Sequence, residues 1–171
     1  MLSMAIDVKD NVKKITEKTI KEGGVLATLY FDIHAKTKED VQKLGAGFLE
    51  HLIKTPGVVY AVGEINEPIE NEEGKNVSSS IEVKLLTRNF LTLANICLEN
   101  SPFSVEINQP NSIVLPLNQA IELLGQLSVT TAEYKKNFLM RLATPEELAE
   151  LQRQLALRAE MGKRLLENKK E

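Results

Sequence analysis

Apolar residues alternate with more polar ones along Val25–Ala35, and this pattern is the clearest structural signal in the chain. Successive side chains of a strand point to opposite faces, so Leu29 and Phe31 belong to one face of a sheet, and Thr28 and Asp32 to the other. A polar second face indicates a sheet that is fully covered on one side only. Similar patterns predict further strands at 58–65, with a bulge near Gly63, at 78–87 and 103–108, and a short one at 112–115.

Helical spacing of three and four residues predicts helices before, between and after these strands. Thr37 and Asp40 resemble a capping box that starts a helix ending near Thr55, because Pro56 disfavours helical geometry in the residue before it. Gly23 ends the first helix, since glycine accepts the left-handed conformation. These helices are expected at 3–22, 38–55 and 90–99.

The C-terminal third of the chain carries helical signals only. Pro116 suits the first turn of one helix, and Thr130 with Glu133 resembles the capping box of a second, short helix. The segment Thr144–Glu147 combines a capping threonine, a first-turn proline and a glutamate, and so starts a third helix that runs past residue 165. That helix presents a candidate interface to the core or to another subunit, formed by Leu148, Leu151, Leu155 and Leu165.

The element order predicts an α+β architecture of the ferredoxin-like type: a βαββαβ antiparallel sheet with two helices on one face. The strands predicted at 25–35, 78–87 and 103–108 each carry an apolar face that the two helices can cover. We divide the chain into an N-terminal amphipathic helix (1–23), the ferredoxin-like domain (24–115) and a C-terminal helical extension (116–171). Gly45-Ala-Gly47 lies within a predicted helix, which favours close helix packing over nucleotide binding.

The second face of the sheet is the candidate functional site. If the strand at 25–35 is central, as the ferredoxin-like order implies, Asp32 and His34 lie in the middle of that face. A histidine near carboxylates suits acid/base chemistry or metal binding, although a plain polar surface explains the same residues. No second histidine or cysteine has zinc-like spacing, so we expect no metal and no cofactor. The candidate site residues are Tyr30, Asp32, His34, Glu82, Lys84 and Glu106.

Composition and charge exclude several classes of protein. The 171 residues carry a net charge of −3, which rules out a strongly basic nucleic-acid protein. The single cysteine, Cys97, permits no internal disulfide and suits a reducing compartment. No secretory signal and no membrane span is apparent, so we expect a cytoplasmic protein. The acidic stretch 64–75 is interpreted as a solvated hairpin loop, because it lacks the spacing of a calcium loop.

Across residues 24–115 the chain resembles amino-acid-binding modules of the ACT type in its element order. The segment Ala35–Asp40 stands where those modules have a Gly-Asp-x-Pro-Gly turn. The resemblance implies a regulatory small-molecule effector. RNA-recognition modules share the element order, but the strand at 78–87 lacks their aromatic residues, and acids on the same face repel phosphate. RNA binding is therefore left to the lysine-rich helix at 3–22.

The leading functional prediction is a non-enzymatic cytoplasmic protein that acts through protein association as a homo-oligomer. Exposed sheet edges and amphipathic helices are commonly covered by a symmetric partner. The absence of a catalytic motif favours this role over an enzyme that uses His34. A small-molecule-binding domain and an RNA-binding helix remain the alternatives.

Overall fold

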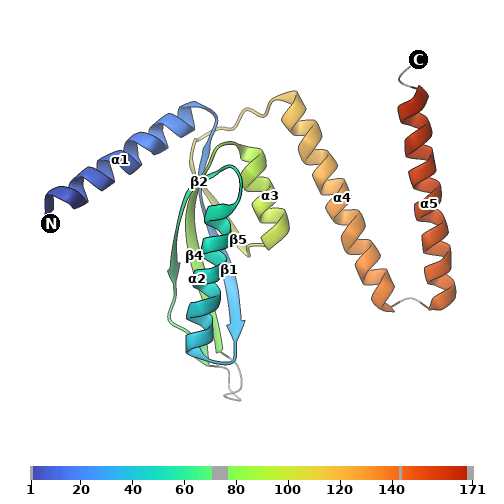
Figure 1. The fold of residues 1–171 in the computed structure, drawn as a ribbon, viewed down its shortest axis with the longest axis horizontal. Coiled ribbons are helices and arrows are strands. Elements are labelled where there is room, and N and C mark those ends of the chain that lie inside the picture. Colours follow the sequence, from blue (N-terminus) through green and yellow to red (C-terminus); the bar gives the residue numbers. More distant parts are fainter. Residues whose placement is uncertain (1, 71–76, 143, 169–171) are drawn as a thin grey trace. The chain divides into compact units, whose positions relative to one another are not determined.

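The computed structural model describes the backbone of residues 2–70, 77–142 and 144–168. Within these residues it is a mixed α+β structure with a four-stranded antiparallel sheet and five helices (Figure 1). The chain divides into two compact units, Met1–Leu124 and Gly125–Glu171, and the sheet lies in the first. The predicted three-part division of the chain stays a prediction.

The predicted strands and helices form with close to their expected limits. In chain order the elements are α1 (Leu2–Lys21), β1 (Val25–Ala35), α2 (Lys38–Lys54), β2 (Val58–Ile65), β3 (Ile69–Glu70), β4 (Val77–Thr87), α3 (Phe90–Asn100), β5 (Ser104–Gln109), α4 (Leu117–Leu142) and α5 (Pro145–Asn168). The two-residue β3 falls in the stretch predicted as a loop, whose residues 71–75 lie outside the described part. The short strand predicted at 112–115 is wrong, because those residues have no regular structure.

Local signals end the elements where the sequence predicts. The Asp40 N–H donates to Thr37 Oγ1 at 3.1 Å, which confirms Thr37 as the N-cap of α2. Gly23 adopts a φ of 97° after α1, a conformation that glycine tolerates best. The next residue, Gly24, is buried between α1 and the sheet. A Cβ there would lie 2.6 Å from the Thr87 carbonyl oxygen, so only glycine fits.

The strand order is β2-β4-β1-β5, with β3 extending the sheet beside β4. Leu29 pairs with Val83 on one side and with Val105 on the other, so these three side chains share a face. Buried residues of α2 and α3 pack on this face and complete the hydrophobic core, among them Leu52, Leu93 and Ile96. The predicted covering helices are therefore α2 and α3, which lie over the sheet in Figure 1.

The cover is incomplete at β5, contrary to the prediction that both helices roof all the apolar strands. Val105 and Ile107, whose side chains lie on that face, each remain 44% exposed. Helix α2 contacts β2, β1 and β4, and α3 contacts β4. Two helices span the width of about three strands here, and the fourth is left as a partly apolar edge.

The predicted irregularity in β2 is at a different residue. Gly63 pairs regularly with Val83, and the register shifts instead between Val58 and Tyr60. A Cβ at Gly63 would lie 3.2 to 3.3 Å from side-chain atoms of Ile81 and Leu49. Glycine is present because α2 approaches β2 closely, and not because of a bulge.

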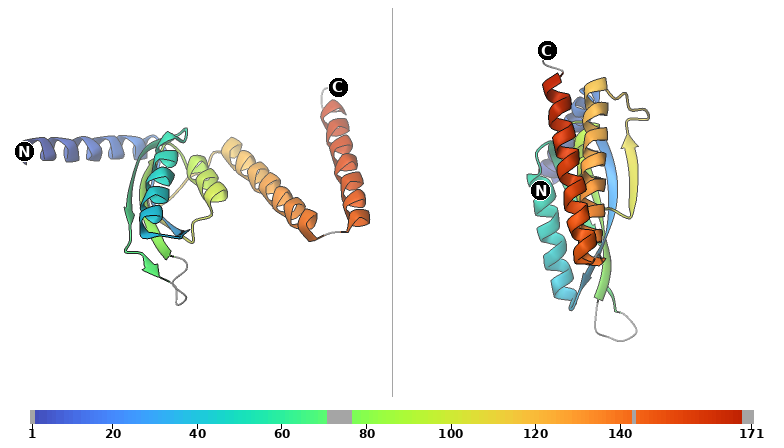
Figure 2. Two further views of the ribbon diagram at one scale, coloured as in Figure 1. Left: turned by 60° about the horizontal axis from the view of Figure 1, so that its bottom comes forward. Right: turned by 90° about the vertical axis from the view of Figure 1, so that its right-hand side faces the viewer.

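The predicted break near Thr130 does not occur. Residues 117–142 form one helix, α4, which Figure 1 and the left view of Figure 2 show as an unbroken rod. No proline lies between Leu117 and Leu142, and helix propagation adds one hydrogen bond for each residue fixed. The Thr130 and Glu133 pattern therefore lies inside a helix and caps nothing.

Candidate functional site

The six predicted site residues lie on one face of three adjacent strands. Tyr30 pairs with Glu82, and Thr28 pairs with Lys84 on one side and Glu106 on the other. Paired residues of an antiparallel sheet project to the same face. We call this surface the polar sheet face; it comprises Tyr30, Asp32, His34, Ser78, Glu82, Lys84 and Glu106. With three acids against one lysine, its net charge is −2 when His34 is neutral.

One end of this side of the sheet is covered, and the other is open. Leu26 and Leu86 are buried at the end near α1, which contacts both β1 and β4. The Thr16 hydroxyl lies 3.0 Å from the hydroxyl of Tyr60, which ties α1 to β2. At the open end the side chains of Asp32 and His34 are 61% and 65% exposed.

Asp32 and His34 lie at an edge of the sheet, and the prediction that they are central is wrong. Strand β5 pairs with β1 only from Leu26 to Tyr30. The last hydrogen bond on this side of β1 joins the N–H of Phe103, the residue before β5, to the Tyr30 carbonyl oxygen at 2.9 Å. Beyond that point β1 is paired on its β4 side alone among the described residues. β5 is too short to flank the two residues.

The structure adds Ser78 to the site. Ser78 lies opposite His34 in the β1–β4 register, and its Oγ is 2.9 Å from His34 Nδ1. The other ring nitrogen, Nε2, is 2.7 Å from Asp32 Oδ2. If the ring proton is on Nε2, it is donated to Asp32, and Nδ1 accepts from the Ser78 hydroxyl. The sequence could not show this contact, because 44 residues separate serine and histidine.

This hydrogen-bonded chain has the order of a nucleophile, a base and an orienting carboxylate. Two features of its surroundings bear on whether such a chain could act on a substrate. Water reaches both His34 and Asp32, so charge stabilisation there is weak. At Ser78, β4 is paired with both β1 and β3, and the sheet uses its backbone donors. Among the residues that the structure describes, this pairing leaves no pair of free N–H groups beside Ser78 to stabilise an oxyanion.

Tyr30 interacts with Glu106 of β5 and with Phe103, the residue just before that strand. Partial desolvation, with the negative charges of Glu106 and Glu82, raises the pKa of Tyr30. Its ring is tilted by 37° against that of Phe103, with centroids 6.1 Å apart. The two rings make an aromatic end to the polar sheet face, and the sequence pattern had placed Phe103 on the opposite side.

The remaining candidate residues are His51, Cys97 and the lysines of α1. His51 is exposed on α2. Cys97 is half-buried in α3 against the core, and this burial raises the pKa of its thiol, which disfavours the reactive thiolate. Among the described residues no cluster of histidine, cysteine and acidic side chains is arranged to hold a metal. Four α1 lysines remain exposed for the predicted RNA contact: Lys13, Lys14, Lys18 and Lys21.

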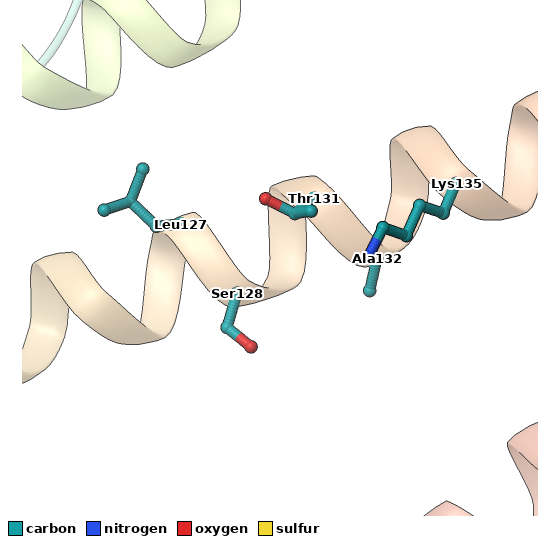
Figure 3. A pocket seen from close by; sticks show the side chains of 5 residues that line it. All are labelled: Leu127, Ser128, Thr131, Ala132 and Lys135. Atoms are coloured by element: carbon teal, nitrogen blue, oxygen red, sulfur yellow. The ribbon is translucent and has the colours of Figure 1, made fainter.

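The predicted leucine interface is only partly described. Leu148 is half-buried and Leu155 is 37% exposed, whereas the side chains of Leu151 and Leu165 lie outside the described part. A nearby hollow of about 370 Å³ is lined by α4 residues alone, which Figure 3 shows along one stretch of the helix. A hollow lined by a single helix has no opposing wall, and we assign it no ligand.

Comparison with known families gives one result. The family model of the MJ0538 family matches residues 26–156. The chain belongs to the MJ0538 family. The match to the MJ0538 family begins in β1 and ends in α5, so it includes the polar sheet face and all of α4. No curated protein and no solved structure matches the chain. None of the described helices is both long and apolar enough to cross a membrane.

Proposed function

We propose that this member of the MJ0538 family acts through protein association, with copies of itself as its first partners, and not through catalysis. The observation that carries the proposal is α4. None of its 26 residues is buried, and large apolar side chains stay exposed along its whole length. Leu117 is 77% exposed, Leu124 66% and Phe138 65%.

A helix with this pattern needs a surface to pack against. Isolated helices are marginally stable in water, and most helical stability in proteins comes from burying an amphipathic face. Soluble monomers seldom expose continuous apolar surfaces of more than a few hundred Å². Both considerations favour a partner that covers α4.

The sheet and its two helices are proposed to be the scaffold that displays α4. The strand order β2-β4-β1-β5, with α2 and α3 over one face, supports a ferredoxin-like βαββαβ module in which β3 is an addition. The free thiol of Cys97 supports a reducing compartment such as the cytoplasm.

Light scattering of the full chain at micromolar concentration tests the proposal. We expect a particle whose mass is a multiple of 19.1 kDa. High salt should preserve it, because apolar contacts are not screened by ions. A single 19.1 kDa species across a concentration series, with α4 fully helical, would overturn self-association.

Hydrolysis at the polar sheet face is a second candidate, favoured by the Ser78–His34–Asp32 hydrogen bonds. An activated ester such as 4-nitrophenyl acetate is a suitable probe. We expect His34→Ala and Ser78→Ala to lower any turnover equally, while His51→Ala, which removes the other histidine, leaves it unchanged. Equal activity in all four proteins would exclude this site.

A further inference from the structure

The continuity of α4 creates a seven-residue repeat that two separate helices would not have. Leu117, Leu124, Thr131 and Phe138 follow one another at intervals of seven. A second set lies three residues after each of these: Ala120, Leu127, Tyr134 and Arg141. This is the a and d spacing of helices that pair along their length. We call these eight positions the α4 seam.

The described part of α5 does not cover the seam. Within the second unit, Leu155 of α5 lines a hollow of about 310 Å³ with α4 residues that include Val129, Ala132 and Lys136. Those positions lie outside the seam, so α5 meets a different face of α4.

The two halves of α4 carry net charges of opposite sign, which favours one orientation of a helical partner. The half at 117–129 carries Glu122 as its only charge, for a net −1. The half at 130–142 carries three basic residues and Glu133, for a net +2. Two parallel copies would place like halves together, whereas antiparallel copies place opposite charges together. Antiparallel pairing also sets the two helix dipoles in opposition.

The side-chain volumes favour the same orientation. In an antiparallel pair, each a position of one helix faces a d position of the other. When the two copies are related by a two-fold axis at the middle of the seam, the residue numbers of two facing positions add up to 258, as for 117 and 141. Ala120 then faces Phe138 of the other copy, and Leu124 faces Tyr134. The small residue meets the large one, as close packing requires. In a parallel pair, phenylalanine would meet phenylalanine, and alanine would meet alanine.

We propose that the α4 seams of two copies pack antiparallel about a two-fold axis near residue 129. The proposal rests on the proposed function and names the partner, the surface and the orientation. The contact is self-complementary and closes with two chains, as is usual for symmetric dimers. The particle should therefore have twice the chain mass of 19.1 kDa.

Disulfide trapping in the full chain tests the orientation. In a Cys97→Ser background, one variant carries Ala120→Cys and another, with an affinity tag, carries Phe138→Cys. The two positions are 18 residues apart, or about 27 Å along a helix. Neither variant should form a disulfide dimer alone, whereas the two chains refolded together should cross-link. Leu117→Cys with Arg141→Cys is an independent pair with the same expectation.

Light scattering tests the surface. Leu124→Lys should halve the particle mass, since it places a charge in the interior of the seam, whereas the native Arg141 lies at the end of the helix. Gln126→Lys adds the same charge to the same helix outside the seam, and should leave the mass unchanged. A dimer insensitive to Leu124→Lys would overturn the seam.

Other outcomes separate this inference from the proposed function. Cross-linking of each single-cysteine variant with itself would show parallel pairing, and would overturn the antiparallel arrangement while leaving self-association intact. An associated particle in which neither pair cross-links would overturn the seam pairing alone. A monomeric wild type destabilised by Leu124→Lys would show that its own chain covers the seam, and both proposals would then fail.

Discussion

The helices α2 and α4 are both amphipathic, but the apolar face of α2 is buried and that of α4 is exposed. In α2 the apolar face packs on the sheet, and Val41 and Leu52 are 0% exposed. In α4, which is nine residues longer (26 against 17), no residue is buried. The contrast shows that the sequence pattern of a helix determines which of its faces is apolar. It does not determine which other surface packs against that face.

The largest expected difference between the two regions is the cost of removing a leucine. Leu29 is 0% exposed in the core, so Leu29→Ala should lower the free energy of unfolding by about 2–5 kcal/mol. Leu124→Ala should change the unfolding of the sheet by less than about 0.5 kcal/mol, because Leu124 does not belong to the core that packs on the sheet. Urea unfolding followed by hydrogen exchange of β1 amides measures both. Equal losses would show that α4 belongs to the same core.

Two glycines of α2 allow the buried and the exposed face of one helix to be compared. A Cβ at Gly45 would clash with Ile65 Cδ1, so Gly45→Ala forces α2 away from the sheet or displaces Ile65, at a cost of about 1–3 kcal/mol. A Cβ at Gly47 meets nothing within 4 Å, and Gly47→Ala should stabilise the protein by about 0.5–1 kcal/mol through helix propensity. Thermal unfolding of the pair should shift in opposite directions; a common direction would contradict the packing described here.

Helix caps offer a smaller contrast between the regions. The Asn89 side chain accepts the Thr92 N–H at 2.8 Å and begins α3, which packs on the core. Asn89→Ala should therefore reduce global stability by about 1 kcal/mol. Thr144→Ala removes the equivalent cap of α5, and should reduce helical circular dichroism without moving the urea midpoint of the sheet. A shift of that midpoint with Thr144→Ala would show that the two units unfold together.

The smallest effect is the response of α5 to acid. Hydrogen bonds from the Thr144 backbone N–H and hydroxyl lower the pKa of Glu147. A lowered folded pKa gives a stabilisation that is present above the unfolded pKa and lost as the pH falls through the folded one. Carboxyl NMR should show Glu147 titrating below the ordinary glutamate range, and the start of α5 should fray over the same pH range. In Thr144→Ala the pKa should rise only part of the way to that ordinary range, because the hydroxyl is lost while the backbone N–H of residue 144, the larger cause of the lowered pKa, remains. A titration unaffected by this substitution would contradict the cap.

Local signals were sufficient for much of the fold. The alternation of Val25–Ala35 predicts β1 at its observed limits, and the caps at Thr37 and Thr144 are confirmed by their hydrogen bonds. These features depend on residues within about four positions of one another, where spacing and conformational preference decide the outcome. The common face of the predicted site residues follows from the same two-residue period, once the strands pair.

Pairing between distant segments decided the rest. The contact of His34 with Ser78 depends on the β1–β4 register, and the exposed edge beside Asp32 depends on where β5 ends. The position of Gly63 reflects the approach of α2, not its own turn preference. In α4 a capping pattern at Thr130 yielded to the helix around it, because an unbroken run keeps every backbone hydrogen bond. The sequence determined which faces of this protein are apolar, and the tertiary structure decided which of them are buried, because burial requires a second surface that local preferences do not specify.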